Sequence, residues 1–379
     1  MGFLSLLLWF LALPALSATY PLEEDVVGEI QTIRARYEDT LPDIARRFDL
    51  GYDELVRVNP GVDPWLPGEG TEIVLPTQFV LPRAPREGIV LNLPEMRLYY
   101  YPPGGREVVT YPVGIGREGW DTPLGKTRIV ARVANPSWYP PASIRKEHEA
   151  QGDPLPKVVP PGPDNPLGDF ALRLGFPGYL IHGTNKPYGI GMRVSHGCIR
   201  LYPEDIAELF SRVKVGTPVH IIDQPYKAGW KEGKLYLEAH PPLKERESPY
   251  TPVVETLVIA QGERQVAIDW DKALKVAEEA LGWPVVVSVP EEEKAPAKAK
   301  RMAAVEGGWF VQAGAFTDPD AAQRMVEALQ ALDPPIPARR TSLHGVHQVI
   351  AGPFAEKQKA QQVARRMVFH FRVEPRIFQ

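Results

Sequence analysis

The sequence predicts a multidomain α+β protein built around a β-rich central domain. The chain has 379 residues, which exceeds what one ordinary hydrophobic core holds and favours two to four domains. Apolar periodicity changes along the chain, from a strand–helix–helix–strand order to short β-rich runs and then to two strand–helix halves. A polar stretch at residues 291–306 separates the last part from the rest and is expected to be a flexible linker.

The composition excludes several classes of protein. The formal net charge is -4 at pH 7, so the chain lacks the broad basic field that nucleic-acid binding needs. The 41 prolines and 32 glycines follow no repeating period, which excludes a collagen-like chain, and the 44% of hydrophobic residues argues against a wholly disordered one. We therefore expect globular domains with many loops and no nucleic acid as partner.

Residues 1–18 have the pattern of a secretory signal peptide. An apolar run from Phe3 to Leu13 is followed by small residues between Ala15 and Ala18. The run is short for a membrane span, although the absence of Lys or Arg before it leaves a retained N-terminal anchor as the alternative. We expect export to the periplasm, and no cysteine stands at the cleavage site to carry a lipid.

Residues 33–77 predict a small βααβ domain. An apolar stripe at helical spacing between Leu41 and Phe48 predicts a first helix, a run stopped by Pro60 predicts a second, and a strand closes the unit before Pro76. The unit contains motif positions at Thr40-Leu41, Ile44-Ala45, Phe48, Leu55, Asn59-Pro60, Pro67-Gly68 and Ile73-Val74-Leu75-Pro76. At these positions it resembles the LysM family, which binds N-acetylglucosamine-containing glycan, and a purely structural role is the alternative.

Residues 86–223 predict an antiparallel or mixed β-domain, because short β-rich runs alternate with turn residues such as Pro102-Pro103-Gly104-Gly105. A Pro-rich excursion at 135–166 interrupts the strands, and we interpret it as a flap that covers substrate. A helix at 203–210 and a strand at 218–222 should close the core.

The C-terminal third predicts an appendage and a further domain. Residues 224–290 carry no chemistry that the sequence identifies. Residues 307–379 contain two strand-then-helix halves, which predicts a small ferredoxin-like domain with helices on one sheet face. Residues 311–316 and 349–354 resemble the SPOR family, which binds peptidoglycan glycans stripped of stem peptides. An ordinary ferredoxin-like domain is the alternative.

Cys198 is the only cysteine, so an exported chain cannot form an internal disulfide, and the free thiol is a candidate nucleophile. A thiol needs a nearby imidazole to take its proton, and His182, at the end of an apolar strand, is the predicted base. His196 would share a strand face with Cys198 if the segment is extended, and could tune the thiol or contact substrate. Gly197 leaves the amides of residues 197 and 198 uncovered, which suits an oxyanion hole.

Arg200 offers a fork of donors that matches a substrate carboxylate, with a surface ion pair as the alternative. A buried structural cysteine with two core histidines is the second alternative for this region. A zinc site is the third, but one cysteine and two histidines are too few ligands for a closed structural site. We expect no metal and no organic cofactor.

Two motifs resemble, residue for residue, the signature of the L,D-transpeptidase catalytic domain, also called YkuD. These motifs are His182-Gly183-Thr184 and Ser195-His196-Gly197-Cys198-Ile199-Arg200-Leu201. Further matches at 122–125 and 135–139 extend the resemblance, and the segment after Gln224 is similar to the longer ErfK/YbiS-type subgroup. The resemblance implies a β-rich fold, a thiolate nucleophile at Cys198, a base at His182 oriented by the Gly183 carbonyl, and substrate binding by Ser195 and Arg200.

The function implied is acyl transfer on peptidoglycan stem peptides. Cys198 would attack the third residue of a tetrapeptide stem, expel the terminal D-alanine and form a thioester, which an amine resolves. The amine could belong to diaminopimelate of a neighbouring stem, giving a 3-3 cross-link, or to a lysine of an outer-membrane lipoprotein. A carboxypeptidase that uses water and a non-catalytic wall-binding scaffold are the other hypotheses, and the SPOR resemblance implies enrichment at the division septum.

Overall fold

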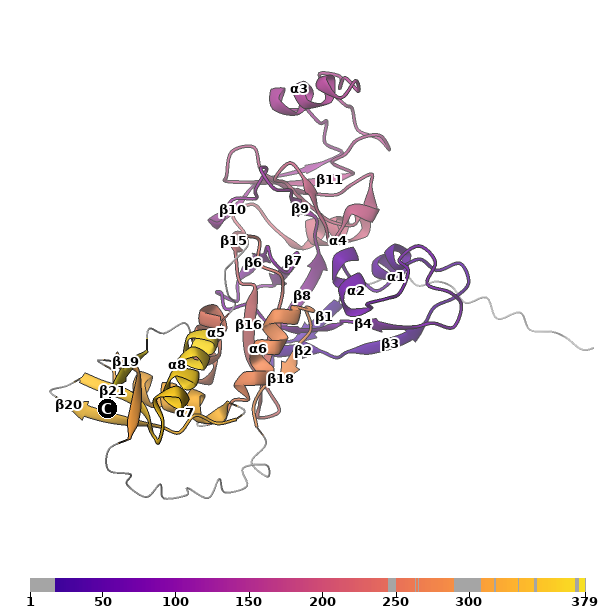
Figure 1. The fold of residues 1–379 in the computed structure, drawn as a ribbon. Coiled ribbons are helices and arrows are strands. Elements are labelled where there is room, and N and C mark those ends of the chain that lie inside the picture. The colour runs from indigo at the N-terminus through magenta and orange to yellow at the C-terminus, as the bar shows by residue number, and fades with distance from the viewer. Residues whose placement is uncertain are drawn as a thin grey trace, which may run out of the picture. The chain divides into compact units, whose positions relative to one another are not determined.

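Figure 1 shows the computed structural model of the chain. The structure describes residues 18–244, 250–262, 264, 266–289, 308–316, 318–332, 334–343, 346–371 and 375–378. The predicted linker at 291–306, and the predicted signal peptide at 1–18 except its last residue, lie outside the described residues. The chain divides into two compact units, the first mainly residues 27–225 and the second mainly residues 226–280 and 284–379. In the part of the chain that the structure describes, no helix is long and apolar enough to cross a membrane.

The first unit contains the predicted βααβ order near its N-terminus. The elements are β3 (Gln31–Arg34), α1 (Leu41–Arg47), α2 (Tyr52–Val58) and β4 (Glu72–Leu75). β3 and β4 pair antiparallel, and Thr40 caps α1 by accepting a hydrogen bond from the Asp43 N–H at 3.2 Å. Two further strands that the sequence analysis missed, β2 (Val26–Gly28) and β5 (Gln78–Val80), pair with each other.

A nine-stranded sheet forms the centre of the first unit, in the order β1-β8-β7-β6-β15-β10-β11-β12-β14. The strands are β1 (Ala18–Pro21), β6 (Gly88–Asn92), β7 (Arg97–Tyr101), β8 (Glu107–Pro112), β10 (Gly125–Ala134), β11 (Phe170–Leu174), β12 (Leu180–His182), β14 (Ile199–Arg200) and β15 (Pro218–Ile222). Neighbours pair antiparallel except β15 with β6 and β12 with β14, which are parallel. The predicted β-domain is therefore confirmed as a mixed sheet.

The βααβ arrangement and the sheet share one hydrophobic core. Leu41 and Leu55 from the two helices are fully buried in the same cluster as Tyr99 and Val108 from the sheet. At the rim, the Tyr52 N–H donates to the Ile190 carbonyl at 3.0 Å. Because apolar side chains of both parts leave water together, their association is stabilised by the same hydrophobic term as the core itself.

A buried ion pair crosses this shared core. Arg97 of β7 is fully buried, and its Nη2 lies 2.7 Å from Glu54 Oε2 of α2. The guanidinium also donates to Thr110 Oγ1 at 3.2 Å and lies 4.2 Å from the centroid of the Phe79 ring. A second pair joins Arg46 of α1 to Glu204 at 2.8 Å, but both side chains are partly exposed.

The second unit contains two antiparallel sheets. A three-stranded sheet consists of β16 (Tyr226–Lys231), β17 (Lys234–Ala239) and β18 (Val285–Val286), with helices α5 (Tyr250–Gln261) and α6 (Trp270–Glu279). A four-stranded sheet has the order β20-β21-β19-β22. Its elements are β19 (Trp309–Phe316), α7 (Pro319–Ala331), β20 (Ala338–Leu343), β21 (Val346–Phe354), α8 (Lys357–Phe371) and β22 (Arg376–Phe378).

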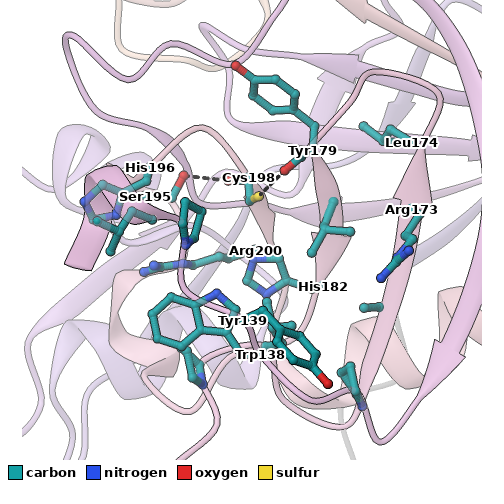
Figure 2. A pocket seen from close by; sticks show the side chains of 18 of the residues that line it. Trp138, Tyr139, Arg173, Leu174, Tyr179, His182, Ser195, His196, Cys198 and Arg200 are labelled. Carbon is teal, nitrogen blue, oxygen red and sulfur yellow. Dashed lines mark hydrogen bonds between the residues drawn. The ribbon is translucent and has the colours of Figure 1, made fainter. Parts of the chain in front are cut away.

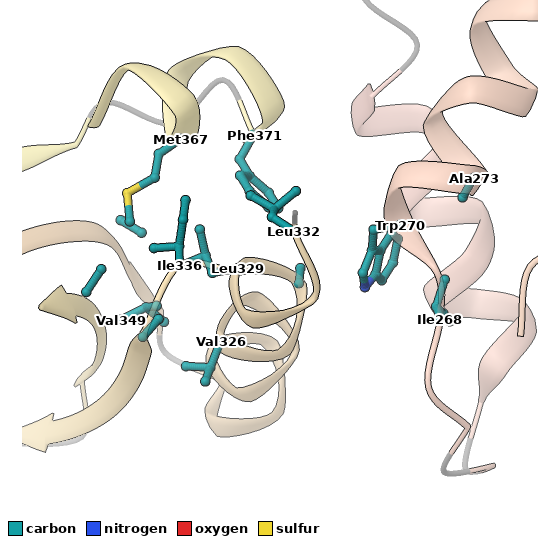
Figure 3. Packing of buried hydrophobic residues seen from close by; sticks show 14 of the residues in the cluster. Ile268, Trp270, Ala273, Val326, Leu329, Leu332, Ile336, Val349, Met367 and Phe371 are labelled. Carbon is teal, nitrogen blue, oxygen red and sulfur yellow. The ribbon is translucent and has the colours of Figure 1, made fainter. Parts of the chain in front are cut away.

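The two predicted strand-then-helix halves are confirmed in this second sheet, because α7 follows β19 and α8 follows β21. Figure 3 shows Val326, Leu329 and Met367 from the two helices gathered with Val349 of β21, and all four side chains are buried. The sequence analysis did not predict β20 and β22, which extend the sheet on either side of the repeated strands.

We predict that Arg97→Met lowers the free energy of unfolding by about 3–5 kcal/mol, because Glu54 would stay buried without its partner. Urea denaturation measures the change. Arg46→Met is the matched control, since it removes an Arg–Glu pair between the same two parts that is partly exposed, and it should cost less than about 1 kcal/mol. Equal losses in the two variants would contradict the interpretation.

Candidate active site

A cavity of about 840 Å³ opens on the first unit. Strands β10 to β12, the segment that leads into β14 and residues 136–144 contribute to its walls. The five side chains selected from the sequence all line it, namely His182, Ser195, His196, Cys198 and Arg200. Figure 2 shows His182, Cys198 and Arg200 near one another within this cavity. The fold thus brings together side chains that stand up to 18 positions apart in the sequence.

The pairing of β12 with β14 explains why these side chains share a cavity. The two strands are parallel, with Ile181 opposite Ile199 and His182 opposite Arg200. Ile181 and Ile199 are fully buried. Because side chains alternate between the faces of a strand, the residues next to these isoleucines point to the other face. His182, Cys198 and Arg200 are therefore directed together into the cavity.

His182 is held as a neutral imidazole. Its Nδ1 lies 2.6 Å from the Gly183 carbonyl oxygen. Since a carbonyl only accepts hydrogen bonds, Nδ1 carries the proton and Nε2 keeps the lone pair of the neutral ring. Burial, together with the positive charge of Arg200, lowers the pKa of His182 to about 3, although the carbonyls of Gly183 and Leu167 favour the protonated ring. At neutral pH the ring can accept a proton at Nε2.

Cys198 is protonated at rest. Its Sγ lies 3.8 Å from the Gly178 carbonyl oxygen, and the residue is partly accessible. Burial raises the pKa of the thiol above its ordinary value, while a hydrogen bond from the Leu180 backbone and the charge of Arg200 act in the opposite direction. The resting site is therefore a neutral thiol beside a neutral imidazole, and the proton must move when the sulfur attacks.

A network of hydrogen bonds fixes the loop that carries Cys198. The Ser195 hydroxyl donates to the Cys198 carbonyl at 2.6 Å and accepts from the Gly197 N–H at 3.1 Å. Thr122 Oγ1 donates to the Gly197 carbonyl at 2.9 Å. Gly197 has φ +99°, and a Cβ there would lie 2.9 Å from the Tyr179 ring, so both conformation and space require glycine.

This network uses the Ser195 hydroxyl, which was predicted to bind substrate, and the Gly197 N–H, which was predicted to contribute to the oxyanion hole. Ser195 is fully buried, with its hydroxyl engaged inside the loop, so substrate binding by Ser195 stays a prediction. The Gly197 N–H donates to Ser195 in this arrangement, which leaves the Cys198 N–H as the predicted oxyanion donor. The sequence analysis gave Thr122 no role, because its contact with the Gly197 carbonyl spans 75 positions.

His196 does not share an extended strand with Cys198. The chain bends at residues 196–197, after β13 (Arg193–Ser195), so the condition for a shared strand face is not met. His196 Nε2 lies 3.0 Å from Glu147 Oε2 and 3.1 Å from Arg117 Nη2, and Arg117 also pairs with Glu147. Burial lowers the pKa of His196, and the Glu147 carboxylate partly offsets this effect.

Glu147 belongs to α3 (Ala142–Ala150), which lies within the excursion predicted as a flap. The sequence analysis expected no helix there. Trp138, Tyr139 and Ile144 from the excursion line the cavity, so this segment forms one of its walls. The contacts of Glu147 tie the wall to the loop that carries His196. No local pattern in the sequence indicates this contact, because the partners are 49 positions apart.

Arg200 lines the cavity with its positive charge directed toward the catalytic groups. Its charge lowers the pKa of both Cys198 and His182. Its Nε is buried and has no hydrogen-bond partner in the described chain. Among the residues that line the cavity, the metal-ligating types are His182, His196 and Cys198, fewer than the four ligands of a closed zinc site.

Comparison with known proteins assigns the chain to a family. A model of the L,D-transpeptidase catalytic domain, YkuD, matches residues 86–221, and a model of the SPOR domain matches residues 305–370. The chain is 48% identical over 245 residues to the probable L,D-transpeptidase YcfS of Escherichia coli strain K12, which covers 62% of this chain and 77% of that relative. The chain belongs to the L,D-transpeptidase family.

A further curated relative agrees with this assignment. The probable L,D-transpeptidase ErfK/SrfK of Salmonella typhimurium strain LT2 is 41% identical over 291 residues, covering 72% of this chain and 92% of that relative. A solved L,D-transpeptidase structure from Mycobacterium smegmatis is 20% identical, covers 38% of this chain and 62% of its own, and has a TM-score of 0.30. The sequence-based resemblances to the L,D-transpeptidase and SPOR families are confirmed. The protein is thus an L,D-transpeptidase of the cell envelope, with peptidoglycan as its substrate.

We predict that the rate at which iodoacetamide alkylates Cys198 of this L,D-transpeptidase rises with pH. The midpoint of this rise, the apparent pKa of the thiol, should lie above the ordinary thiol value of about 8.5. In Arg200→Gln this pKa rises further, because the cation that stabilises the thiolate is lost. Mass spectrometry of the adduct gives the alkylation rates at pH values from about 6 to about 10, a range that includes the pKa of the thiol.

Arg173→Gln is the matched control for this experiment. Arg173 lines the same cavity but is exposed, and the charges that shift the pKa of Cys198 do not include it. Its replacement should leave the pH profile in place. An equal shift in the two variants, or a wild-type profile centred below the ordinary thiol value, would reject the electrostatic assignment.

Proposed function

We propose that this L,D-transpeptidase forms a thioester through Cys198 from tetrapeptide stems and transfers the acyl group to an amine. The observation that carries the proposal is the parallel register of β12 and β14, which directs His182, Cys198 and Arg200 into one cavity. The neutral imidazole, with its lone pair on Nε2, supports His182 as the base that takes the thiol proton.

Acylation then follows a balanced sequence. His182 Nε2 takes the proton from the Cys198 thiol as sulfur bonds to the carbonyl carbon of the third stem residue. The Cys198 N–H donates to the developing oxyanion. The tetrahedral intermediate collapses, the peptide bond to the terminal D-alanine breaks, and the imidazolium returns the proton to the leaving amine. Because burial disfavours the imidazolium, this return is strongly downhill.

An amine resolves the thioester. It attacks the same carbonyl carbon, His182 accepts the proton that the nitrogen loses, and the Cys198 thiol leaves with that proton. The amine belongs either to diaminopimelate of a second stem or to a lysine of an outer-membrane lipoprotein. Arg200 binds a carboxylate of the stem peptide, which its charge and its place on the cavity wall support.

We predict that the purified protein converts tetrapeptide muropeptides into cross-linked dimers with release of D-alanine, as followed by mass spectrometry. Cys198→Ser and His182→Gln should each reduce the rate by at least about 100-fold, because the first removes the thiol and the second the proton acceptor. His148→Gln is the matched control, since His148 lies on α3 and does not line the cavity. Formation of tripeptide without dimer would show that water resolves the thioester and would contradict transfer to an amine. Unchanged activity of either active-site variant would reject the mechanism.

We further propose that wall-binding domains flank the catalytic domain at residues 86–223 and its appendage at 224–290. Residues 33–77 act as a LysM-like glycan-binding domain, and the SPOR domain at 307–379, beyond the linker at 291–306, binds glycan strands and enriches the enzyme at the septum. Export by the signal peptide at 1–18 brings the protein to the periplasm. Binding to an insoluble polymer raises the effective concentration of the active site near its substrate.

We predict that removal of residues 307–379 reduces retention of the protein on sacculi treated with an amidase, measured by co-sedimentation. The amidase matters because it strips stem peptides and so exposes the glycan that a SPOR domain binds. Retention on untreated sacculi should fall less. Activity on soluble muropeptides is the control for folding, and equal retention with and without the domain would reject its proposed role.

A further inference from the structure

The first described residue of the chain already belongs to the fold. Strand β1 begins at Ala18, which pairs with Thr110 of β8, and the pairing continues to Pro21 opposite Glu107. The backbone N–H of Ala18 donates to Asp49 Oδ2 at 3.4 Å. The nitrogen of this residue therefore faces a carboxylate that follows helix α1.

That carboxylate is part of a buried cluster with too little positive charge. Asp49, Glu54, Arg97 and Asp205 come from four separate segments, and each is at most 5% exposed. Three of them are acids and one is a base. Arg97 pairs with Glu54 at 2.7 Å, and its Nη2 donates to the backbone carbonyl of Asp49 rather than to its carboxylate. A buried charge without a partner is costly, so the cluster as it stands disfavours ionised Asp49 and Asp205.

The carboxyl groups of Asp49 and Asp205 are hydrogen-bonded to each other, but each also has an oxygen that shows this deficit. In the described chain, Asp49 Oδ1 and Asp205 Oδ2 are buried without a hydrogen-bond partner. Burial raises the pKa of Asp49 to about 6, and burial together with the charge of Asp49 raises the pKa of Asp205 well above its usual range. Other titratable groups act on the pair. The phenols of Tyr20 and Tyr202 have pKa values raised by burial, Glu204 pairs with Arg46, and Glu208 pairs with Arg212.

The sequence before Ala18 has the residue types of a cleavage site. Ala15 and Ser17 are small and stand at the third and first positions before Ala18, which is the spacing of an A-x-A-like signal-peptidase site. Hydrolysis of the Ser17–Ala18 bond adds water, leaving a carboxylate on Ser17 and an α-ammonium group on Ala18. The new positive charge would form on the nitrogen that faces Asp49.

We propose that cleavage between Ser17 and Ala18 creates an α-ammonium group that pairs with Asp49 and completes the buried cluster. The proposal rests on the export proposed above. It corrects the predicted signal-peptide boundary by one residue, because a cut after Ala18 would remove the nitrogen that faces Asp49. The direction of backbone N–H groups alternates along a strand, so Thr19 as first residue would present its nitrogen to the other side.

The pairing stabilises the contact between the N-terminal helices and the catalytic sheet. Asp49 lies between α1 and α2, and Asp205 lies in α4 (Pro203–Arg212) beside Ile206. The Cγ2 of Ile206 is 3.0 Å from the position of a Cβ on Gly183, the residue that orients His182. Removal of the signal peptide would therefore strengthen the packing behind the active site at the moment when the protein reaches the cell wall.

The first test concerns the cleavage position. The full chain is expressed with export and the periplasmic protein is analysed by intact mass and N-terminal sequencing. Ala18 as the first residue is the expected result. Thr19 as the first residue, or a retained leader, overturns the proposal.

The second test needs no export. The chain from Ala18 onward is released from a cleavable tag with a free amine, and part of it is acetylated selectively at the N-terminus. At pH 7, where a free α-amine is mostly charged, the free form should melt at least about 5 °C higher, because acetylation keeps an N–H donor but removes the charge. Equal melting temperatures overturn the pairing.

The dependence on Asp49 and on pH completes this test. Asp49→Asn should abolish the difference between the two forms, whereas Glu38→Gln, an exposed acid nearby in sequence, should preserve it. Pairing raises the pKa of the ammonium in the folded state, so the advantage is full between the Asp49 pKa of about 6 and the unfolded amine value of about 8. It is lost as pH rises through the folded ammonium value, and also at low pH as Asp49 is protonated. A difference that persists in Asp49→Asn, or is independent of pH, overturns the proposal, and muropeptide transfer reports separately on the catalytic mechanism.

Discussion

The active site depends on the pairing of two very short strands. β12 has three residues and β14 has two, so few backbone hydrogen bonds hold them in register. The register is supported instead by the burial of Ile181 against Ile199 and by the Ser195 hydrogen bonds inside the adjoining loop. A shift by one residue would turn His182 toward the core and an isoleucine into the cavity. The apolar residues of these strands are thus what position the polar ones.

Burial disfavours the charged form at both polar centres of the first unit, yet the two groups have opposite charge states. At His182 it acts together with the charge of Arg200, and both keep the imidazole neutral. At Arg97 the surrounding carboxylates favour the charged guanidinium, so the cation persists in the core. The difference lies in the neighbours, since a low dielectric strengthens every charge interaction, whatever its sign. A group held neutral can exchange a proton during a reaction, whereas a paired ion holds segments together.

The sequence alone identifies the catalytic groups that stand in short motifs. His182 and Cys198 stand in short motifs, and the apolar run before His182 already predicts a strand that ends at this histidine. The loops were harder, because the sequence left open whether residues 196–198 are extended, and the chain bends at residues 196–197. Glu147 could not be predicted from the sequence, since its contact with His196 arises only when a distant helix folds over the loop. The buried partner of Arg97 was missed for the same reason, being 43 positions away.

The electrostatics of the cavity determine which charge state of the acceptor amine the proposed mechanism favours. An amine attacks a thioester only as the free base, and the positive charge of Arg200 in a partly buried cavity disfavours an ammonium ion there. The same charge keeps His182 neutral, so Nε2 is free to take the proton that the attacking nitrogen gives up. A protonated imidazolium could not accept this proton at the start of the step. Burial, which makes Cys198 a weak acid at rest, therefore acts together with the charge of Arg200 to prepare the acyl-enzyme to receive an uncharged amine.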